Sequence, residues 1–128
     1  MKSCIFCDID GVIFPFDEWD KCLIPGHKPT LLPTSQDIIK QWHVEGHKIV
    51  LVTGRPASMR DATIKQLNDA GIVYDQVIMD CGSGPRYLIN DIASKKGKKK
   101  AIAMNVMRNK GIGWYISLEK YRDDFSPE

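Results

Sequence analysis

The sequence predicts a single α/β domain whose sheet is mainly parallel and has about five strands. Three observations carry this expectation: short apolar segments alternate with amphipathic ones, glycines and prolines separate them, and acidic residues follow the first apolar segment. Strands that alternate with helices pair in parallel through right-handed crossovers. We therefore expect a three-layer domain, with helices on both faces of the sheet, over residues 1–128.

The first expected strand covers residues 4–9, an apolar run that no proline interrupts. Side chains alternate between the two faces of a strand, so Asp8 and Asp10 share one face. Gly11 follows them and permits a sharp turn. Two carboxylates held so close repel unless a cation lies between them or one binds a proton. The pair therefore indicates a chemical site.

The next elements are a loop, a helix and a strand. Residues 14–33 are rich in proline and charge, and we expect a flap or short hairpin over the site. A helix follows, with Thr34 as its N-cap and Asp37 as part of a capping box, and it ends at Gly46. Residues 48–53 are β-branched or apolar and predict the second buried strand.

The second half of the chain continues the alternation. We expect a helix over residues 57–70 and three further strands, over residues 76–79, 87–89 and 101–106. The charged tail, residues 120–128, is expected to fray.

Composition excludes several classes of protein. The net charge of +2 makes no case for a nucleic-acid partner, and the lysine-rich run at residues 95–100 lacks the interleaved aromatic side chains that stack on bases. No apolar run approaches the roughly 20 residues that span a bilayer, and no secretory signal opens the chain. Cys4 and Cys7 are three residues apart in a strand, on opposite faces, which favours free thiols. We expect a cytoplasmic protein.

Polar residues fall where the expected strands end. Asp8 and Asp10 end the first strand, Thr53 the second, and Asp91 the fourth, and ligands of open α/β sheets bind at these carboxyl ends. Three carboxylates and a hydroxyl form a hard oxygen site that suits Mg²⁺. Thr53 and Gly54 precede a helix and offer a hydroxyl and backbone N–H groups to a phosphate. The set predicts a metal-assisted phosphoryl-transfer site.

These motifs resemble those of the haloacid dehalogenase superfamily of phosphohydrolases. Residues 8–12 (DIDGV) are similar to its first motif, residues 51–55 (LVTGR) to its second, and residues 88–91 (LIND) to its acidic fourth. The resemblance implies a Rossmann-like domain. About 40 residues separate the first two motifs, which leaves no room for a separate cap domain. Capless relatives have open sites or assemble so that a neighbour closes them, so a homo-oligomer is one expectation.

The resemblance also implies residue roles. Asp8 is the nucleophile that forms an aspartyl-phosphate, and Asp10 is the general acid and base. Asp8, the backbone carbonyl of Asp10, and Asp91 hold Mg²⁺. Thr53 and a cationic side chain bind the equatorial phosphate oxygens.

The cation is where the sequence departs from the family pattern, in which a lysine precedes the fourth motif. Arg60, Lys65 and Arg86 are the cations between the second and fourth motifs. Arg86 is preferred because it follows a glycine-rich loop at the start of the fourth strand, whereas Lys65 lies in mid-helix. Arg55 either binds substrate or forms a structural ion pair.

We therefore expect a magnesium-dependent phosphatase acting on a small-molecule phosphate ester, a sugar phosphate or nucleotide-type phosphate. The missing lysine, together with Asn90 before Asp91, supports an alternative: a catalytically weak or silent phosphate-binding or regulatory module. A receiver-type signalling domain is a second alternative. The position of Asp10, two residues beyond Asp8, argues against it because that acid is suited to hydrolyse the acyl-phosphate.

Overall fold

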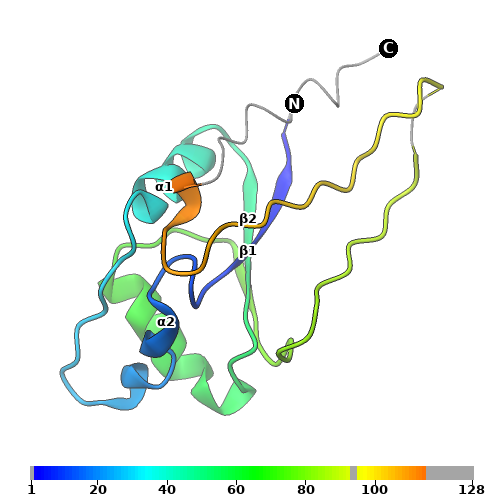
Figure 1. Ribbon diagram of the computed structural model, residues 1–128. Helices are drawn as coiled ribbons and strands as arrows, with labels where there is room; N and C mark the ends of the chain where they lie inside the picture. The colour runs from blue at the N-terminus through cyan, green and yellow to red at the C-terminus, as the bar shows by residue number, and fades with distance from the viewer. Residues whose placement is uncertain (1, 93–94, 115–128) are drawn as a thin grey trace.

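The computed structural model describes residues 2–92 and 95–114 of the chain (Figure 1). Its strands and α-helices are β1 (Cys4–Asp8), α1 (Ser35–Val44), β2 (Lys48–Val52), α2 (Arg60–Asp69) and β3 (Gln76–Ile78). Four 3₁₀ turns accompany them: η1 (Phe16–Glu18), η2 (Lys21–Leu23), η3 (Ala57–Met59) and η4 (Ile112–Trp114). The expected tail, residues 120–128, lies outside the described residues.

The three strands form one parallel sheet in the order β1-β2-β3. The register places Asp8 beside Val52, and Val52 beside Ile78, so the carboxyl ends of the three strands lie together. A helix connects each consecutive pair of strands. The α/β class and the parallel pairing predicted from the sequence are therefore confirmed.

The two faces of this sheet differ. One face is buried throughout and packs against side chains of both helices, and its members are Ile5, Cys7, Ile49, Leu51 and Val77. On the other face Phe6 is 51% and Ile78 43% exposed, whereas Val50, the register partner of Phe6, is buried. Two successive right-handed crossovers in one direction put both helices on the same face, and Figure 1 shows α1 and α2 on the same side. Within the described residues the two α-helices thus cover one face of the sheet, an arrangement compatible with the α/β Rossmann-like domain that the sequence predicts.

The expected fourth and fifth strands are also absent from the described residues. Residues 87–89 and 101–106 join no strand, and the side chains of Tyr87 and Ile89 are 85% and 90% exposed. Figure 1 shows the described part of residues 87–106, called the outward segment below, running away from the sheet and returning. One isolated antiparallel bridge joins Ile92 to Lys99 within it. A short apolar run specifies a strand only if it gains a partner, and these runs gain none.

The predicted helices are present, but the start of α1 differs from the prediction. Thr34 has a left-handed φ of 66° and makes no capping hydrogen bond to its own helix. Its Oγ1 accepts the backbone N–H of Gly113 at 3.0 Å instead. The side chain therefore joins the helix to a distant segment, which local sequence did not indicate.

Residues 14–33, called the flap below, contain no hairpin. The flap consists of η1, η2 and connecting loops, and η2 packs against α2. Glu18 is buried in it, and its Oε2 lies 2.8 Å from His27 Nε2. This contact closes the flap on itself.

The cysteines are all free, as the sequence favoured. Cys4 is exposed and Cys7 is buried on the opposite face of β1. Burial raises the pKa of the Cys7 thiol to about 12, so this thiol is unreactive at neutral pH.

Candidate active site

A tight loop after β1 presents two carboxylates. The carbonyl of Ile9 accepts the N–H groups of Ile13 at 2.8 Å and Phe14 at 3.2 Å, while the Gly11 N–H donates to the Phe14 carbonyl at 2.7 Å. Gly11 adopts a φ of +87°, which strains any residue with a side chain. Because Ile9, Ile13 and Phe14 are fully buried, the loop is anchored and Asp8 is held at its open end.

The ionisation of Asp8 reflects its surroundings. Burial raises the pKa of this carboxyl above its ordinary value of 3.8, and the nearby Asp10 carboxylate raises it further. The Ile9 N–H, which donates to Asp8 Oδ1 at 2.8 Å, lowers that pKa. The positive charges of Arg86 and Arg108 also lower it. Both arginines therefore act on the carboxylate that we expect to be the nucleophile.

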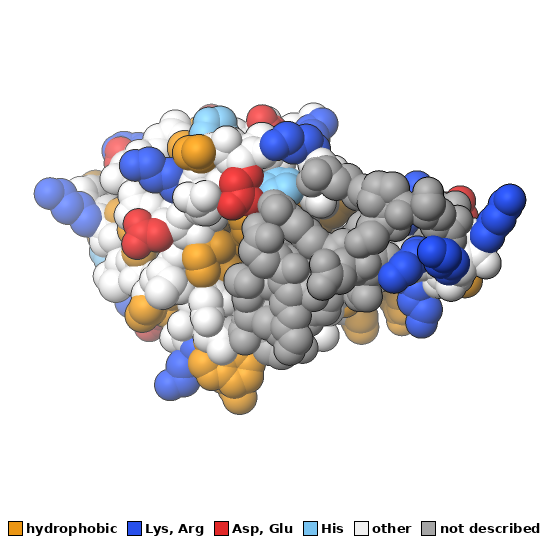
Figure 2. Space-filling model, turned by 90° about the horizontal axis from the view of Figure 1, so that it is seen from above, with side chains coloured by type: hydrophobic (Ala, Val, Ile, Leu, Met, Phe, Trp, Pro, Cys, Tyr) orange, Lys and Arg blue, Asp and Glu red, His pale blue; other side chains and the backbone are white. Residues whose placement is uncertain are grey.

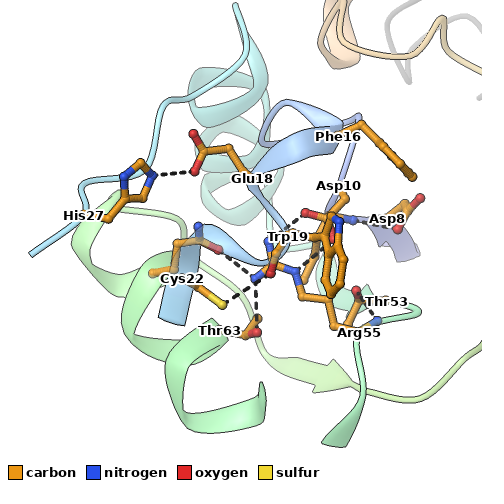
Figure 3. A network of polar contacts seen from close by, with 12 residues as sticks. Asp8, Asp10, Phe16, Glu18, Trp19, Cys22, His27, Thr53, Arg55 and Thr63 are labelled. Atoms are coloured by element: carbon orange, nitrogen blue, oxygen red, sulfur yellow. Dashed lines mark hydrogen bonds and ion pairs between the residues drawn. The ribbon is translucent and has the colours of Figure 1, made fainter. Parts of the chain in front are cut away.

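Arg55 is the centre of a buried polar network (Figure 3). Its Nε donates to Asp10 Oδ2 at 2.9 Å, and its Nη2 donates to Asp10 Oδ1 at 2.7 Å. Its Nη1 donates to Thr63 Oγ1 at 3.1 Å and to Gln66 Oε1 at 2.7 Å, both on α2. Only 1% of the Arg55 side chain is exposed. Of the two roles left open by the sequence, the structure places Arg55 in the ion pair.

The flap closes over this network. The Cys22 thiol donates to the Trp19 carbonyl at 3.4 Å, and burial raises the pKa of this thiol while the Arg55 charge lowers it. Trp19 has 43% of its surface exposed, and in the view of Figure 3 its ring projects over Asp10 and Arg55. The flap thus adds an accessible aromatic ring to the carboxylate site.

Thr53 lies directly after β2, as predicted, and is fully buried. Its Oγ1 accepts the backbone N–H of Arg55 at 3.1 Å. Its own backbone is fixed, because its N–H donates to Ile78 and its carbonyl accepts the Cys81 N–H. The hydroxyl proton of Thr53 therefore remains as its hydrogen-bond donor for a ligand.

Gly54 is required by a close approach between two loops. A Cβ at this position would lie 2.6 Å from the carbonyl oxygen of Gly82. The same loop holds Arg86, whose guanidinium donates to the carbonyls of Cys81 at 3.2 Å, Gly82 at 3.0 Å and Gly84 at 2.8 Å. The charge of Arg86 reaches Asp8, but its N–H groups bind its own loop.

The second candidate cation lies elsewhere. Lys65 is on the exposed side of α2, 76% exposed, and its Nζ forms an ion pair with Asp69 Oδ2 at 2.7 Å. It takes no part in the carboxylate site. The lysines at residues 95–100 belong to the outward segment, and Figure 2 shows Lys and Arg side chains gathered at that end of the molecule.

The expected magnesium ligands come together only in part. Asp8 and Asp10 are adjacent, but Asp91 is exposed in the outward segment. Within residues 2–92 and 95–114, no three His, Cys, Asp or Glu side chains form a group able to hold a metal ion. The Asp8 carboxylate and the Asp10 carbonyl are hard oxygen donors, and a Mg²⁺ ion that keeps several waters needs only one or two carboxylates. These two donors fit such an ion, and the role of Asp91 stays a prediction.

Sequence reasoning missed three participants: Arg108, Thr63 and Gln66. Thr63 and Gln66 are three residues apart on α2, a spacing that places them on one face, and this spacing is the signal that could have indicated a shared partner. Arg108 lies 100 residues beyond Asp8, and nothing near it in the sequence marks it as part of the site.

Comparison with known protein families gives a match. A family described as haloacid dehalogenase-like hydrolases matches residues 5–84, which is more than half of the chain. No curated protein matches the sequence significantly.

Within the described residues, none of the helices has both the length and the apolar character needed to traverse a bilayer.

Two solved structures are similar in fold. One is titled as the structure of a Pnkp1/Rnl/Hen1 complex, with a TM-score of 0.52 and 22% identity over 75% of this chain, which spans 33% of that chain. The other is a structural-genomics target from Vibrio cholerae, with a TM-score of 0.57 and 14% identity over 98% of this chain and 97% of the other. At these identities the likeness concerns the fold.

Proposed function

Because this chain belongs to the haloacid dehalogenase-like hydrolases, we propose that it is a phosphatase that cleaves phosphomonoesters with Asp8 as the nucleophile. The observation that carries the proposal is the position of Asp8. Its carboxylate lies at the carboxyl end of β1, beside Asp10, and within reach of the charges of two arginines. A phosphate dianion needs such cationic surroundings to approach a carboxylate.

The proposed reaction has two steps at Asp8. In the first, an oxygen of Asp8 bonds to phosphorus and the bond from phosphorus to the ester oxygen breaks. In the second, water attacks the aspartyl-phosphate, releasing inorganic phosphate and restoring the carboxylate. Asp8 Oδ1 accepts the Ile9 N–H, and we assign the attack to Oδ2.

Asp10 is proposed to move the protons. It gives a proton to the departing ester oxygen and takes one from the attacking water. Each carboxylate oxygen has two lone pairs, so Asp10 keeps acceptor capacity on both oxygens while it binds Arg55. Arg55 is then a positioning residue, because it orients Asp10 and is itself buried.

Magnesium and phosphate contacts complete the proposal. The Asp8 carboxylate and the Asp10 carbonyl would hold Mg²⁺, with Asp91 as the further ligand that the family motif suggests. When bound, the ion offsets the repulsion between the Asp8 carboxylate and the phosphate dianion. The Thr53 hydroxyl and the Gly54 N–H, both at the end of β2, are proposed to bind phosphate oxygens.

The substrate is proposed to be a small phosphate ester, either a sugar phosphate or a nucleotide-type phosphate. Phe16 and Trp19 on the flap are 44% and 43% exposed, and both flank the carboxylates (Figure 3). A sugar ring or a base can pack against such rings. The cytoplasmic location and the homo-oligomeric state expected from the sequence stay proposals.

The test is the hydrolysis of an aryl phosphate with Mg²⁺ or with a chelator. Asp8→Asn is expected to abolish turnover, because the amide is no nucleophile, while the Ile9 hydrogen bond keeps the loop folded. Asp61→Asn on the exposed side of α2 is the matched control and should keep full activity. Turnover that survives in Asp8→Asn, or that a chelator leaves unchanged, contradicts the proposed mechanism.

One observation favours a second candidate function, a catalytically silent phosphate-binding module. Asp91 is exposed and lies outside the sheet, and the described residues contain no group of three metal-ligating side chains. Such a module would bind inorganic phosphate by calorimetry and release no product from sugar phosphates, nucleotides or phosphopeptides. The phosphatase proposal predicts turnover with at least one of these classes.

A further inference from the structure

A turn near the end of the described chain docks on the Gly11 loop. The Asn109 N–H donates to the Gly11 carbonyl at 2.9 Å, and Asn109 Oδ1 accepts the Phe16 N–H at 2.7 Å. Within the turn, the Lys110 N–H donates to the Met107 carbonyl at 3.2 Å. These bonds fix residues 107–110 against both the Gly11 loop and the flap, although about 90 residues separate the turn from these two segments in the sequence.

This turn places the side chain of Arg108 against the Gly11 loop. A Cβ built on Gly11 would lie 3.2 Å from Arg108 Cγ and 3.9 Å from its Nε. The guanidinium carbon is 3.8 Å from the centre of the Phe16 ring, which is a cation–π stack. The side chain is thus held between Gly11 and Phe16, directly beside the Asp8 and Asp10 segment.

The geometry points to Arg108 as the residue that binds the substrate phosphate above Asp8, in the role that the family pattern gives to a lysine. This inference rests on the proposed phosphatase function and adds a substrate-binding residue to it. Arg108 is one of two cations whose charge acts on Asp8. It is the one whose N–H groups have no carbonyl or carboxylate acceptor within the described residues, since those of Arg86 bind three carbonyls.

Arginine chemistry suits this role. The guanidinium is planar, always charged, and presents its N–H donors as a fork that matches two phosphate oxygens. Stacking on Phe16 occupies a face of the plane and leaves the N–H edge for hydrogen bonding. Phe16 thereby orients the fork before substrate arrives, which reduces the entropy lost on binding.

The experiment compares Arg108→Ala, Arg108→Lys and Lys110→Ala. Lys110→Ala removes the same charge from the same exposed turn and is the matched control. Binding of inorganic phosphate is measured by titration calorimetry with Mg²⁺ present, and KM and kcat are measured with an aryl phosphate. Circular dichroism verifies that each variant is folded.

Arg108→Ala is expected to weaken phosphate binding and to lower kcat/KM, each on the order of 10- to 100-fold, as for the loss of a hydrogen-bonded charge. Arg108→Lys should recover part of the loss, because it keeps the charge without the planar fork. Lys110→Ala should match the wild type. An Arg108→Ala protein with unchanged phosphate affinity, or equal losses in Arg108→Ala and Lys110→Ala, overturns the inference.

The two proposals fail in different ways. If the wild type binds phosphate but hydrolyses no ester, the phosphatase proposal fails, while the calorimetric comparison still decides the role of Arg108. If the wild type hydrolyses esters and Arg108→Ala does so equally well, the phosphatase proposal stands and the assignment of Arg108 is wrong. A wild type that binds no phosphate contradicts the assignment as well.

Discussion

Arg55 holds both carboxylate oxygens of Asp10 in a two-point ion pair, with N–O distances of 2.9 and 2.7 Å. The pair joins the loop after β1 to the loop after β2, and Thr63 and Gln66 extend it to α2. The position of the proposed proton-transfer group therefore depends on a buried guanidinium that does not face solvent.

Removing this guanidinium should destabilise the protein. Arg55→Ala leaves Asp10, Thr63 and Gln66 without their donor, and loss of one partner of a buried ion pair costs about 3–5 kcal/mol. The free energy of unfolding is measured by urea denaturation. In a double-mutant cycle with Asp10→Asn, the two effects should be non-additive, and additive effects would show that the pair is not coupled.

Replacing Asp8 should have the opposite effect on stability. The pKa of the Asp8 carboxyl is raised, so the folded protein holds an unfavourably buried anion above that pKa, and protonation relieves the cost as pH falls. Asp8→Asn should therefore raise the melting temperature at neutral pH in the presence of a chelator. The difference from the wild type should shrink on acidification, and a variant less stable than the wild type at neutral pH contradicts this account of the site.

The close approach of Gly54 to the loop at Gly82 can be tested by two alanine substitutions, one at the contact and one elsewhere in the same loop. Gly54→Ala places a Cβ 2.6 Å from a backbone oxygen and should cost about 1–3 kcal/mol while displacing the loop that holds Arg86. Gly84→Ala in the same loop meets no atom within 4 Å and should be nearly neutral. Thermal unfolding and kcat/KM report the two effects, and equal behaviour of the two variants would mean that the close approach is unimportant.

The thiols should differ in reactivity. With its pKa at about 12, Cys7 has almost no thiolate at neutral pH and is buried, whereas Cys4 is exposed on the same strand. Mass spectrometry after treatment of the folded protein with iodoacetamide should find Cys4 modified and Cys7 unmodified. Modification of Cys7 at a comparable rate would show that β1 opens readily.

The sequence predicted the elements up to residue 79 because their apolar periodicity was long enough to distinguish strand from helix. The positions of Asp8, Asp10 and Thr53 at strand ends followed from the same patterns. The runs at residues 87–89 and 101–106 have the composition of strands, but composition does not provide a neighbouring strand.

The contacts within the site were harder to predict than the strands that carry it. Arg55 follows Thr53 closely, and its sequence context suits either a substrate contact or an ion pair. Only the burial of its side chain between Asp10 and α2 distinguishes the two. Arg108 reaches the site through hydrogen bonds between Asn109 and two distant loops, and no local pattern encodes such long-range contacts.

Phosphate bound to Asp8 during turnover is the direct sign that this residue is the nucleophile. The enzyme is mixed with an aryl phosphate and Mg²⁺, quenched in acid, digested and examined by mass spectrometry. The proposed mechanism requires one added phosphoryl group on the peptide that contains Asp8, and none in Asp8→Asn. Sustained hydrolysis without phosphate on that peptide would contradict it.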